Sequence, residues 1–363
     1  MTPPLPHAVD APVAVASPIV AEDVAGILAF PLPWHRLAGK HVLITGAAGM
    51  IGGYLLETLA ALEGATGQGP ARIHALARDG AKLAARHPAL CAREDVDFLI
   101  QNVDAPITSL ARLDYVIHAA SPASPKRYLA DPVGTIQANV TGTHHLLELA
   151  KAHGARLLYL SSGTVYGSAD GQNDAMDEHC FGPYDPLDAR ACYTESKRVA
   201  ETLCASYGRQ HGVETVIARL SHTYGPGADL DDGRVFSDFV GHAVAGQPIT
   251  LLGSGEEGRA FLYLADAVQA LLLLLLEGEA GEAYNLGAEN EMTMLELATL
   301  VAELAGGPAY PIARQAANAS LPPAPRKAGH FDIGKLKALG WQPTTPPAAG
   351  FRRMLDHYLS LGR

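Results

Sequence analysis

The segment Tyr193-Thr-Glu-Ser-Lys197 carries the clearest catalytic pattern in the chain. On a helix, a spacing of four places the phenol and the ammonium on one face, with their Cβ atoms about 5–6 Å apart. A free tyrosine has a pKa of about 10, which is too high for a base at neutral pH. A neighbouring ammonium favours the phenolate and lowers that pKa. The pair therefore predicts a tyrosine base for a hydroxyl proton; a surface helix with a chance Tyr–Lys spacing is the alternative.

A second polar cluster, Ser161-Ser-Gly-Thr164-Val-Tyr166-Gly167, ends an apolar run that predicts a strand. Ser162 and Thr164 are then expected at the carboxyl end of that strand. A hydroxyl there can hydrogen-bond a substrate hydroxyl or the ketone that it becomes. Ordinary turn formation by Ser and Gly is the alternative.

The third chemical feature is a glycine-rich turn, with Gly46, Gly49 and Gly52 in the pattern G-x-x-G-x-x-G. It lies between the apolar run 41–45 and an amphipathic run. Gly46 permits a sharp turn, Gly49 lets the backbone approach a pyrophosphate, and Gly52 lets helix pack on strand. Unpaired N–H groups at the helix N-terminus attract an anion. The strand–turn–helix context favours a dinucleotide site over a simple tight turn.

An alternation of strands and helices must position these residues. We predict strands at 41–45, 72–77, 96–101, 115–119, 156–161 and 215–219, and helices at 50–62, 133–152 and 194–211. Nearly continuous apolar strands separated by helices indicate a parallel sheet covered on both faces. The fold class is therefore α/β, a Rossmann-type doubly wound parallel sheet.

The chain divides into an N-terminal arm and two larger parts. The arm, 1–38, is expected to be partly disordered, with a short helix near 21–29 and Trp34 packed on the body or on a second subunit. Residues 39–220 form the dinucleotide-binding domain, which also receives segments near 261–287. Residues 221–363 form mainly a smaller mixed α/β substrate-binding region at the C-terminal side. Its predicted helices are 236–246, 266–277, 293–305 and 348–361.

Composition excludes several classes of protein. The 38 acidic and 27 basic residues give a net charge of -11, which disfavours a general nucleic-acid or anionic-membrane binder. Four cysteines without a C-x-x-C pair indicate neither a disulfide scaffold nor a zinc site, and they fit a reducing cytoplasm.

No basic region precedes an apolar run near the N-terminus, so no signal peptide is expected. The leucine-rich run 271–276 is too short to span a bilayer, and no metal-ligand spacing is present. We predict a cytoplasmic protein without a metal.

Several motifs together resemble a known family. They are the glycine turn, His118-Ala-Ala-Ser121, 161–167, Tyr193 with Lys197, Tyr224-Gly-Pro226 and Asp332…Lys335…Leu339-Gly-Trp341-Gln-Pro343. This set is similar to the extended short-chain dehydrogenases/reductases of the NAD-dependent nucleotide-sugar epimerase/dehydratase family, and it spans nearly all of 38–360. Within the family, the blocks 121–125, 190–201 and 232–237 look most like UDP-glucuronate decarboxylases.

The resemblance implies a role for each matching residue. Tyr193 would take a proton from a sugar hydroxyl, usually at carbon 4, while hydride passes to the nicotinamide. Lys197 would hold the nicotinamide ribose, and Ser162 and Thr164 would complete the catalytic set. The residues expected to contact the cofactor are Gly46, Gly49, Met50, Ile51, Gly52, Arg78, Asp104, Ala119, Ala120, Ser121, Tyr193 and Lys197. Those expected to contact a nucleotide-diphosphate sugar, UDP-linked by the resemblance, are Ser124, His222, Arg234 and Arg259. A homodimer through 133–152 and 194–211 is also implied.

One departure from the family decides which reaction is favoured. The dehydratases carry an Asp-Glu pair and the decarboxylases a Glu where this chain has Gly163 and Thr164. Removal of the carbon 5 proton and loss of the carbon 6 hydroxyl need a carboxyl acid/base. A Thr here resembles the 4-epimerases, which are isomerases that pass through a transient 4-keto sugar. We therefore favour 4-epimerization; a UDP-glucuronate decarboxylase-like lyase, a 4-keto-sugar reductase and a non-catalytic NAD(P)-binding protein are the alternatives.

Two further departures concern the ligands. His222 replaces the Asn that precedes Tyr-Gly-Pro in the family and helps to hold the diphosphate. The second strand ends at Ala77-Arg78-Asp79, without the carboxylate that binds both ribose hydroxyls of NAD. Arg78 could contact a 2′-phosphate, and Asp79 could still reach the ribose. NAD is the predicted cofactor because redox-neutral sugar enzymes of this family keep it bound; NADP is the alternative.

Overall fold

The computed structural model of the chain describes residues 17–108, 110–167, 175–315 and 330–362. Its centre is a seven-stranded sheet in the order β11-β7-β5-β4-β1-β2-β3, and every pairing within it is parallel. The strands are β1 (His41–Thr45), β2 (Arg72–Ala77), β3 (Val96–Ile100), β4 (Tyr115–His118), β5 (Arg156–Ser162), β7 (Thr215–Leu220) and β11 (Ala283–Leu286). The predicted Rossmann-type fold class is confirmed.

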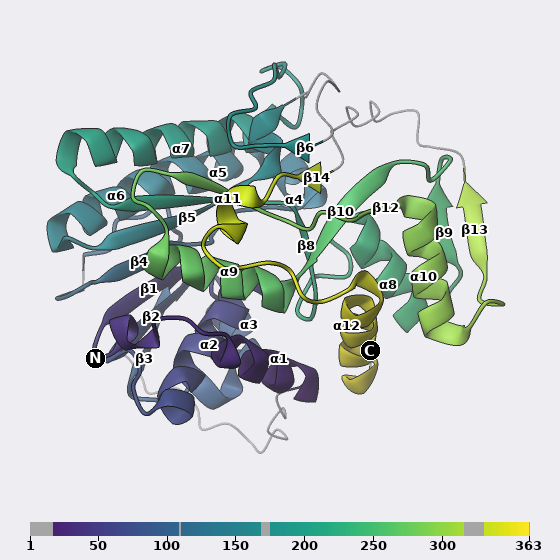
Figure 1. Ribbon diagram of the computed structural model, residues 1–363, viewed down its shortest axis with the longest axis horizontal. Helices are drawn as coiled ribbons and strands as arrows, with labels where there is room; N and C mark the ends of the chain where they lie inside the picture. The colour runs from purple at the N-terminus through teal and green to yellow at the C-terminus, as the bar shows by residue number, and fades with distance from the viewer. Residues whose placement is uncertain (1–16, 109, 168–174, 316–329, 363) are drawn as a thin grey trace, which may run out of the picture.

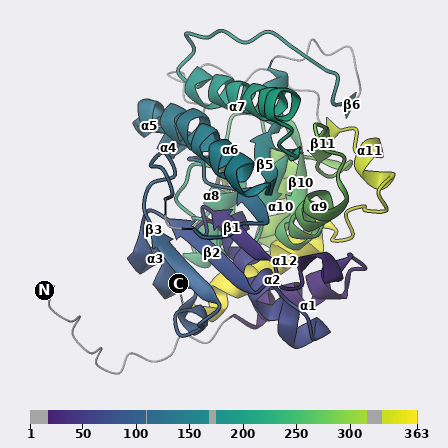
Figure 2. The same ribbon diagram turned by 90° about the vertical axis from the view of Figure 1, so that its left-hand side faces the viewer.

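Helices cover both faces of this sheet (Figures 1 and 2). One face is covered by α2 (Met50–Thr66) and α9 (Leu264–Glu277), with α1 (Pro18–Ala29) packed on both. The other face is covered by α6 (Gly142–His153) and α7 (Ala191–His211). The side chains of β1 alternate accordingly, because successive residues of a strand point to opposite faces. Val42 and Ile44 join the core cluster on the α2 side, and Leu43 joins the cluster on the α6 and α7 side.

The prediction of one continuous helix over 133–152 is wrong. The structure has α5 (Pro132–Ile136), a π-helical turn η3 (Gln137–Thr141) and then α6. Asn139 in that turn is fully buried, and its Nδ2 donates to Ser196 Oγ of α7 at 2.9 Å. A π turn inserts one extra residue in the helix, which aims a side chain that a regular helix would place elsewhere.

The C-terminal region contributes a small sheet and several helices. The three-stranded sheet contains β8 (His222–Tyr224), β10 (Gly258–Tyr263) and β12 (Glu291–Thr293); β9 (Ile249–Leu252) pairs with β13 (Ile312–Gln315), and β6 (Ala175–Met176) pairs with β14 (His330–Phe331). The helices are α8 (Val235–Val244), α10 (Met294–Gly306), α11 (Gly334–Lys337) and α12 (Pro347–Ser360). Short elements elsewhere are α3 (Gly80–Arg86), α4 (Pro125–Ala130), η1 (Trp34–Leu37), η2 (Pro88–Leu90) and η4 (Gly163–Tyr166).

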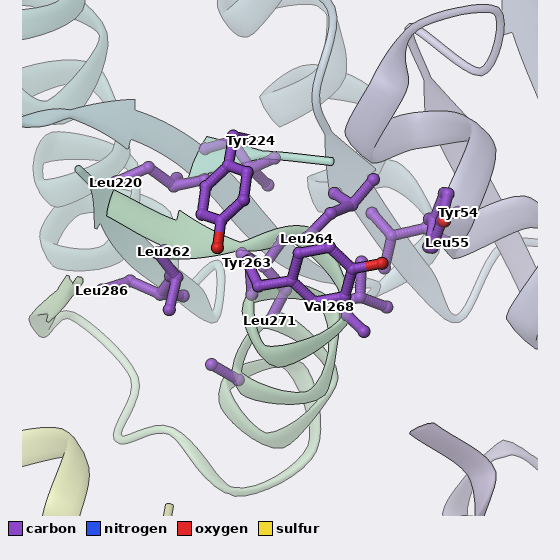
Figure 3. Close-up of a cluster of buried hydrophobic side chains, with 14 of the residues drawn as sticks. Tyr54, Leu55, Leu220, Tyr224, Leu262, Tyr263, Leu264, Val268, Leu271 and Leu286 are labelled. Atoms are coloured by element: carbon purple, nitrogen blue, oxygen red, sulfur yellow. The ribbon is translucent and has the colours of Figure 1, made fainter. Parts of the chain in front are cut away.

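One hydrophobic core joins the C-terminal region to the sheet (Figure 3). Tyr224 stacks on Phe351 of α12 with ring centroids 4.0 Å apart, while Leu262 and Tyr263 lead directly into α9. The leucine-rich run 271–276 of α9 is buried in this core, as predicted. In the part of the chain that the structure describes, no helix is both long and apolar enough to cross a membrane.

The described part of the arm, from Ser17 on, packs on the body. Trp34 is partly buried against the main core, so of its two predicted partners the structure gives the body. The predicted short helix exists as α1 and begins at Pro18, earlier than expected. Residues 1–16, included in the prediction of partial disorder, lie outside the described residues.

Candidate active site

The predicted catalytic residues meet at the carboxyl end of the sheet. Ser162 is the last residue of β5, and Tyr193 and Lys197 lie in the first turns of α7. The Ser162 hydroxyl accepts from the backbone N of Thr164, in η4, at 3.3 Å, and it lies close enough to the Tyr193 phenol to affect the pKa of that phenol. All four side chains line a cavity of about 300 Å³. The cavity is lined by Met50, Ile51, Ala119, Ser121, Ala123, Pro125, Tyr128, Leu160, Ser161, Ser162, Gly163, Thr164, Met176, Tyr193, Lys197, Leu220, Ser221, His222, Thr223, Arg234, Phe236, Arg259, Ala260, His330 and Phe331.

The Tyr193 side chain is buried. Its ring stacks on that of Tyr128, with centroids 5.2 Å apart and planes 14° from parallel. Burial raises the pKa of the Tyr193 phenol, while the hydrogen bond from Ser162 and the charge of Arg234 oppose that rise. A buried phenol becomes a base only where positive charge or donors favour its anion. Neighbouring groups therefore control how readily Tyr193 gives up its proton.

Lys197 supplies the nearest ammonium. Its Nζ donates to the carbonyl of Leu160 at 2.7 Å and lies 5.9 Å from the centroid of the Tyr193 ring. Burial lowers the pKa of Lys197 to about 7, and Glu201 opposes this shift. The predicted placement of phenol and ammonium on one helix face is what the structure has.

The glycine turn has the geometry of a dinucleotide site. Gly46 has φ +71°, and a Cβ on it would lie 2.9 Å from the backbone of Ala119. A Cβ on Gly52 would lie 2.3 Å from the carbonyl oxygen of Gly46, so helix and turn touch directly. Gly49 begins α2 without a capping side chain, which leaves backbone N–H groups for an anion. Ser121 Oγ is buried without a hydrogen-bond partner in the cavity wall. These residues fit a dinucleotide, with Met50, Ile51 and Ala119 between the turn and Tyr193.

The other predicted cofactor residues lie outside the cavity lining. Arg78 is exposed at the end of β2, and Asp104 is partly buried beyond β3. The carboxylate of Asp79, two residues beyond β2, accepts a hydrogen bond from Lys82 N and so caps α3. Ala120 N donates to Thr45 Oγ1 of β1. His118, beside it, is buried and bonds Thr45 through Nδ1, and burial lowers its pKa to about 3; it is a packed, neutral histidine.

Of the four predicted substrate residues, three line the cavity and one does not. His222, Arg234 and Arg259 line the cavity, whereas Ser124 is buried at the start of α4 outside it, with an unpartnered Oγ. Arg234 is oriented by Asp232, whose Oδ2 accepts from Nε at 2.7 Å, and by the ring of Phe236. Among the described residues that line the cavity there is no Asp or Glu, while Lys197, Arg234 and Arg259 bring positive charge.

Sequence reasoning missed four residues of the cavity lining. Tyr128, Met176, His330 and Phe331 come from segments far apart in the chain. A Cβ on Gly163 would lie 2.2 Å from Cζ of Phe331, so this ring explains why residue 163 is a glycine. The motif that begins at Asp332 was a usable signal for its two preceding residues, His330 and Phe331. Nothing in the local sequence indicated Met176.

A parallel doubly wound sheet, a glycine turn and a Ser–Tyr–Lys set at the carboxyl end of the sheet define a short-chain dehydrogenase/reductase. A model of the "NAD dependent epimerase/dehydratase family" matches residues 42–287. The chain belongs to this family, which confirms the recognised resemblance and the choice of NAD.

Known relatives cover almost the whole chain. UDP-glucuronic acid decarboxylase 5 of Arabidopsis thaliana is 38% identical over 327 residues, which are 90% of this chain and 91% of that relative. UDP-glucose 4-epimerase of Thermotoga maritima, solved with UDP-glucose, is 23% identical and superposes with a TM-score of 0.76, covering 89% of this chain and 100% of the other. UDP-glucuronic acid 4-epimerase of Bacillus cereus, solved with UDP-glucuronic acid and NAD, has a TM-score of 0.75 at 23% identity, covering 88% and 99%. The two structures establish the fold.

Proposed function

We propose that this enzyme decarboxylates a UDP-linked uronic acid, UDP-glucuronate, by way of a 4-keto sugar. The sequence alone favoured 4-epimerization, but the relatives that are 36–38% identical over most of the chain are UDP-glucuronic acid decarboxylases. The observation that carries the proposal is the cavity itself. It combines the partly buried Ser162 and the buried Tyr193 and Lys197 with two arginines and, among its described residues, no carboxylate that would repel an acidic sugar.

The first step is oxidation at carbon 4. Tyr193, as its phenolate, takes the hydroxyl proton while Ser162 holds the same oxygen, and Lys197 favours the anionic phenol. NAD, when bound, would supply reversible hydride acceptance at carbon 4. The Gly46–Gly52 turn, Met50, Ile51 and Ser121 would hold it.

The ketone makes the second step possible. It lies β to the carbon 6 carboxylate, so the electrons of the carbon 5–carbon 6 bond can move into the carbon 4 carbonyl as carbon dioxide leaves. The enolate oxygen is then hydrogen-bonded by the protonated Tyr193 and by Ser162, which stabilise the developing charge. Carbon 5 takes a proton from solvent, and reduction at carbon 4 gives a UDP-pentose.

This route answers the objection raised by Gly163 and Thr164. A carboxyl acid/base is required where a carbon 5 proton is removed, as in dehydration, but decarboxylation breaks the carbon 5–carbon 6 bond instead. Arg234 and Arg259 are the natural partners for the diphosphate in a chain whose net charge is -11.

4-Epimerization of the same uronic acid is the second candidate. Thr164, in place of the decarboxylase Glu, is the observation that favours it. That reaction would require the 4-keto sugar to turn within the cavity before hydride returns to its other face.

One incubation separates the two. The purified enzyme, with NAD and UDP-glucuronate labelled at carbon 6, should release labelled carbon dioxide and form a UDP-pentose visible by NMR. Retention of the label in UDP-galacturonate would favour the second candidate. An enzyme that binds NAD and changes no UDP-sugar would contradict both.

Removing the Tyr193 hydroxyl tests the role of the base. Tyr193→Phe should lower kcat by about 10²–10⁴-fold, because it removes the phenol that takes the carbon 4 hydroxyl proton in the proposed mechanism. Tyr207→Phe is the matched control, since Tyr207 is also on α7 and buried, but its hydroxyl bonds Glu148 away from the cavity. Turnover and melting temperature should be measured for both. Near-normal turnover of Tyr193→Phe would overturn the mechanism.

A further inference from the structure

A buried ion pair lies behind the catalytic residues. Glu201 is on α7, four residues after Lys197, and Arg219 is on β7. Arg219 Nη2 donates to Glu201 Oε2 at 2.7 Å, and its Nε lies 3.1 and 3.3 Å from the two carboxylate oxygens. The side chain of Arg219 is only 7% exposed, and that of Glu201 is 12% exposed. Neither belongs to the cavity lining, so the pair contacts the site only through other residues.

The pair is tied to the strand that carries Ser162. Ser161 Oγ donates to Glu201 Oε1 at 2.5 Å. The preceding carbonyl, of Leu160, accepts from Lys197 Nζ at 2.7 Å. Two consecutive residues of β5 are therefore fixed to two consecutive turns of α7. Ser162 is the next residue of that strand, and Tyr193 is one turn before Lys197, so these bonds determine how the two hydroxyls face each other.

Arg219 extends the network to the β6–β14 wall, the part of the cavity that Met176, His330 and Phe331 line. Its Nη1 donates to Tyr166 OH at 3.1 Å and to the Glu178 carbonyl at 2.8 Å. The Tyr166 hydroxyl donates to Asn285 Oδ1. Asn285 Nδ2 in turn donates to the carbonyls of Met176, at 2.8 Å, and Asp332, at 3.1 Å. Asn285 thereby joins β6 and the end of β14, the two short strands that bring Met176 and Phe331 to the cavity.

We propose that Glu201 and Arg219 are positioning residues that align Ser162 and Lys197 with Tyr193 and hold the β6–β14 wall in place. A buried ion pair is weak evidence for stability, because apolar replacements of similar volume are often neutral or stabilising. The role of this pair is to connect three parts of the site, which are α7, the end of β5 and the β6–β14 wall. Glu201 also opposes the fall in the pKa of Lys197 that burial causes. The proposal rests on the proposed role of Tyr193 as the base.

Three variants test it in the full-length enzyme with NAD. Glu201→Gln keeps the shape but loses the charge. Glu201→Met with Arg219→Leu replaces the whole pair by apolar side chains. Glu214→Gln is the matched control, because Glu214 pairs with Arg156 at 3.0 Å at the other end of β5 and β7. Each is assayed for kcat, KM and melting temperature, and the kcat of each is followed against pH.

Misalignment should appear in kcat rather than in KM. We expect kcat of Glu201→Gln and of the double variant to fall about tenfold or more, with KM within about threefold. The alkaline limb of kcat in Glu201→Gln should move to lower pH by about half a unit or more, because Lys197 loses its carboxylate neighbour. The double variant should melt below the wild type, because Ser161 Oγ and the Glu178 carbonyl lose hydrogen-bond partners, so kcat is compared at a temperature at which every variant is folded. Wild-type kcat in either variant, or an equal loss in Glu214→Gln, would overturn the proposal.

A second readout is independent of turnover. The absorbance titration of Tyr193, isolated by subtracting Tyr193→Phe, should move to higher pH in Glu201→Gln, because a displaced Ser162 no longer opposes the rise in the phenol's pKa that burial causes. It should stay unchanged in Glu214→Gln. If the wild type converts no UDP-sugar, the proposed function fails, and this titration alone decides whether the network acts on Tyr193. An unmoved titration would refute that action.

Discussion

Burial disfavours the charged form of Lys197. Its pKa in the folded protein is about 7, against about 10.4 for an unperturbed lysine. Between these two values the unfolded chain binds more protons than the folded one, so this group makes stability rise with pH across that window. Below about pH 7 the lysine is charged in both states, and its full desolvation penalty is present.

Lys197→Met removes that penalty. We expect the variant to gain stability relative to the wild type at pH 6, and the gain to shrink as the pH rises from about 7 to about 10. Chemical denaturation of both proteins across this range measures the difference. Lys151→Met is the control, because Lys151 is exposed beside Glu148 and should show no such trend. A difference between Lys197→Met and wild type that is constant with pH would contradict a depressed lysine pKa.

At the scale of single residues, local spacing predicted what lies on one element. Tyr193 and Lys197 were found because four residues make about one helical turn, and Ser162 because it ends an apolar strand. Tyr128 and Phe331 could not be found, because long-range packing alone brings them beside Tyr193 and Gly163. The glycine at 163 was read as a departure from the decarboxylases, yet its physical reason is the ring of a residue 168 positions later.

At the scale of elements, α1 connects parts of the molecule that the sequence kept apart. Asp23 Oδ2 accepts hydrogen bonds from the hydroxyls of Tyr54, on α2, at 3.0 Å and Tyr263, at the end of β10, at 2.5 Å. Its Oδ1 accepts from Arg353 Nε of α12 at 2.9 Å. The sequence predicted only a short helix here. The partners of Asp23 lie up to 330 residues away, where no local pattern could indicate them.

Replacing Asp23 should therefore have a larger effect than replacing its neighbour. Asp23→Ala removes the carboxylate that accepts from two buried hydroxyls and from Arg353 Nε, and we expect it to lower the free energy of unfolding by about 3–5 kcal/mol. Glu22→Ala removes an exposed partner of the same arginine and should lower it by about 1 kcal/mol or less. Urea denaturation measures both. Equal effects would show that Asp23 does not anchor the arm.

At the scale of the whole molecule, one apolar surface has no cover within the described chain. Val133 and Ile136 of α5 and Val199 of α7 are 64%, 44% and 45% exposed, and these two helices lie side by side (Figure 2). Exposed apolar side chains that form a contiguous patch mark protein interfaces. The sequence had indicated the same helices for a homodimer, and that remains a prediction.

A charge placed in this patch tests the dimer. If α5 and α7 meet their copies in a second subunit, Val133→Asp combined with Val199→Asp buries two unpaired carboxylates in each subunit, at a cost that breaks the interface. The wild type should then sediment as a dimer and the double variant as a monomer. Leu252→Asp is the control, because Leu252 is 57% exposed on β9, in a different sheet from the one that α7 covers, and should leave the dimer intact. A wild type that sediments as a monomer, or a double variant that remains dimeric, would rule out this surface. The monomeric variant would also show whether Tyr193, two turns from Val199, needs the second subunit for activity, since turnover per chain can be compared directly between the two states.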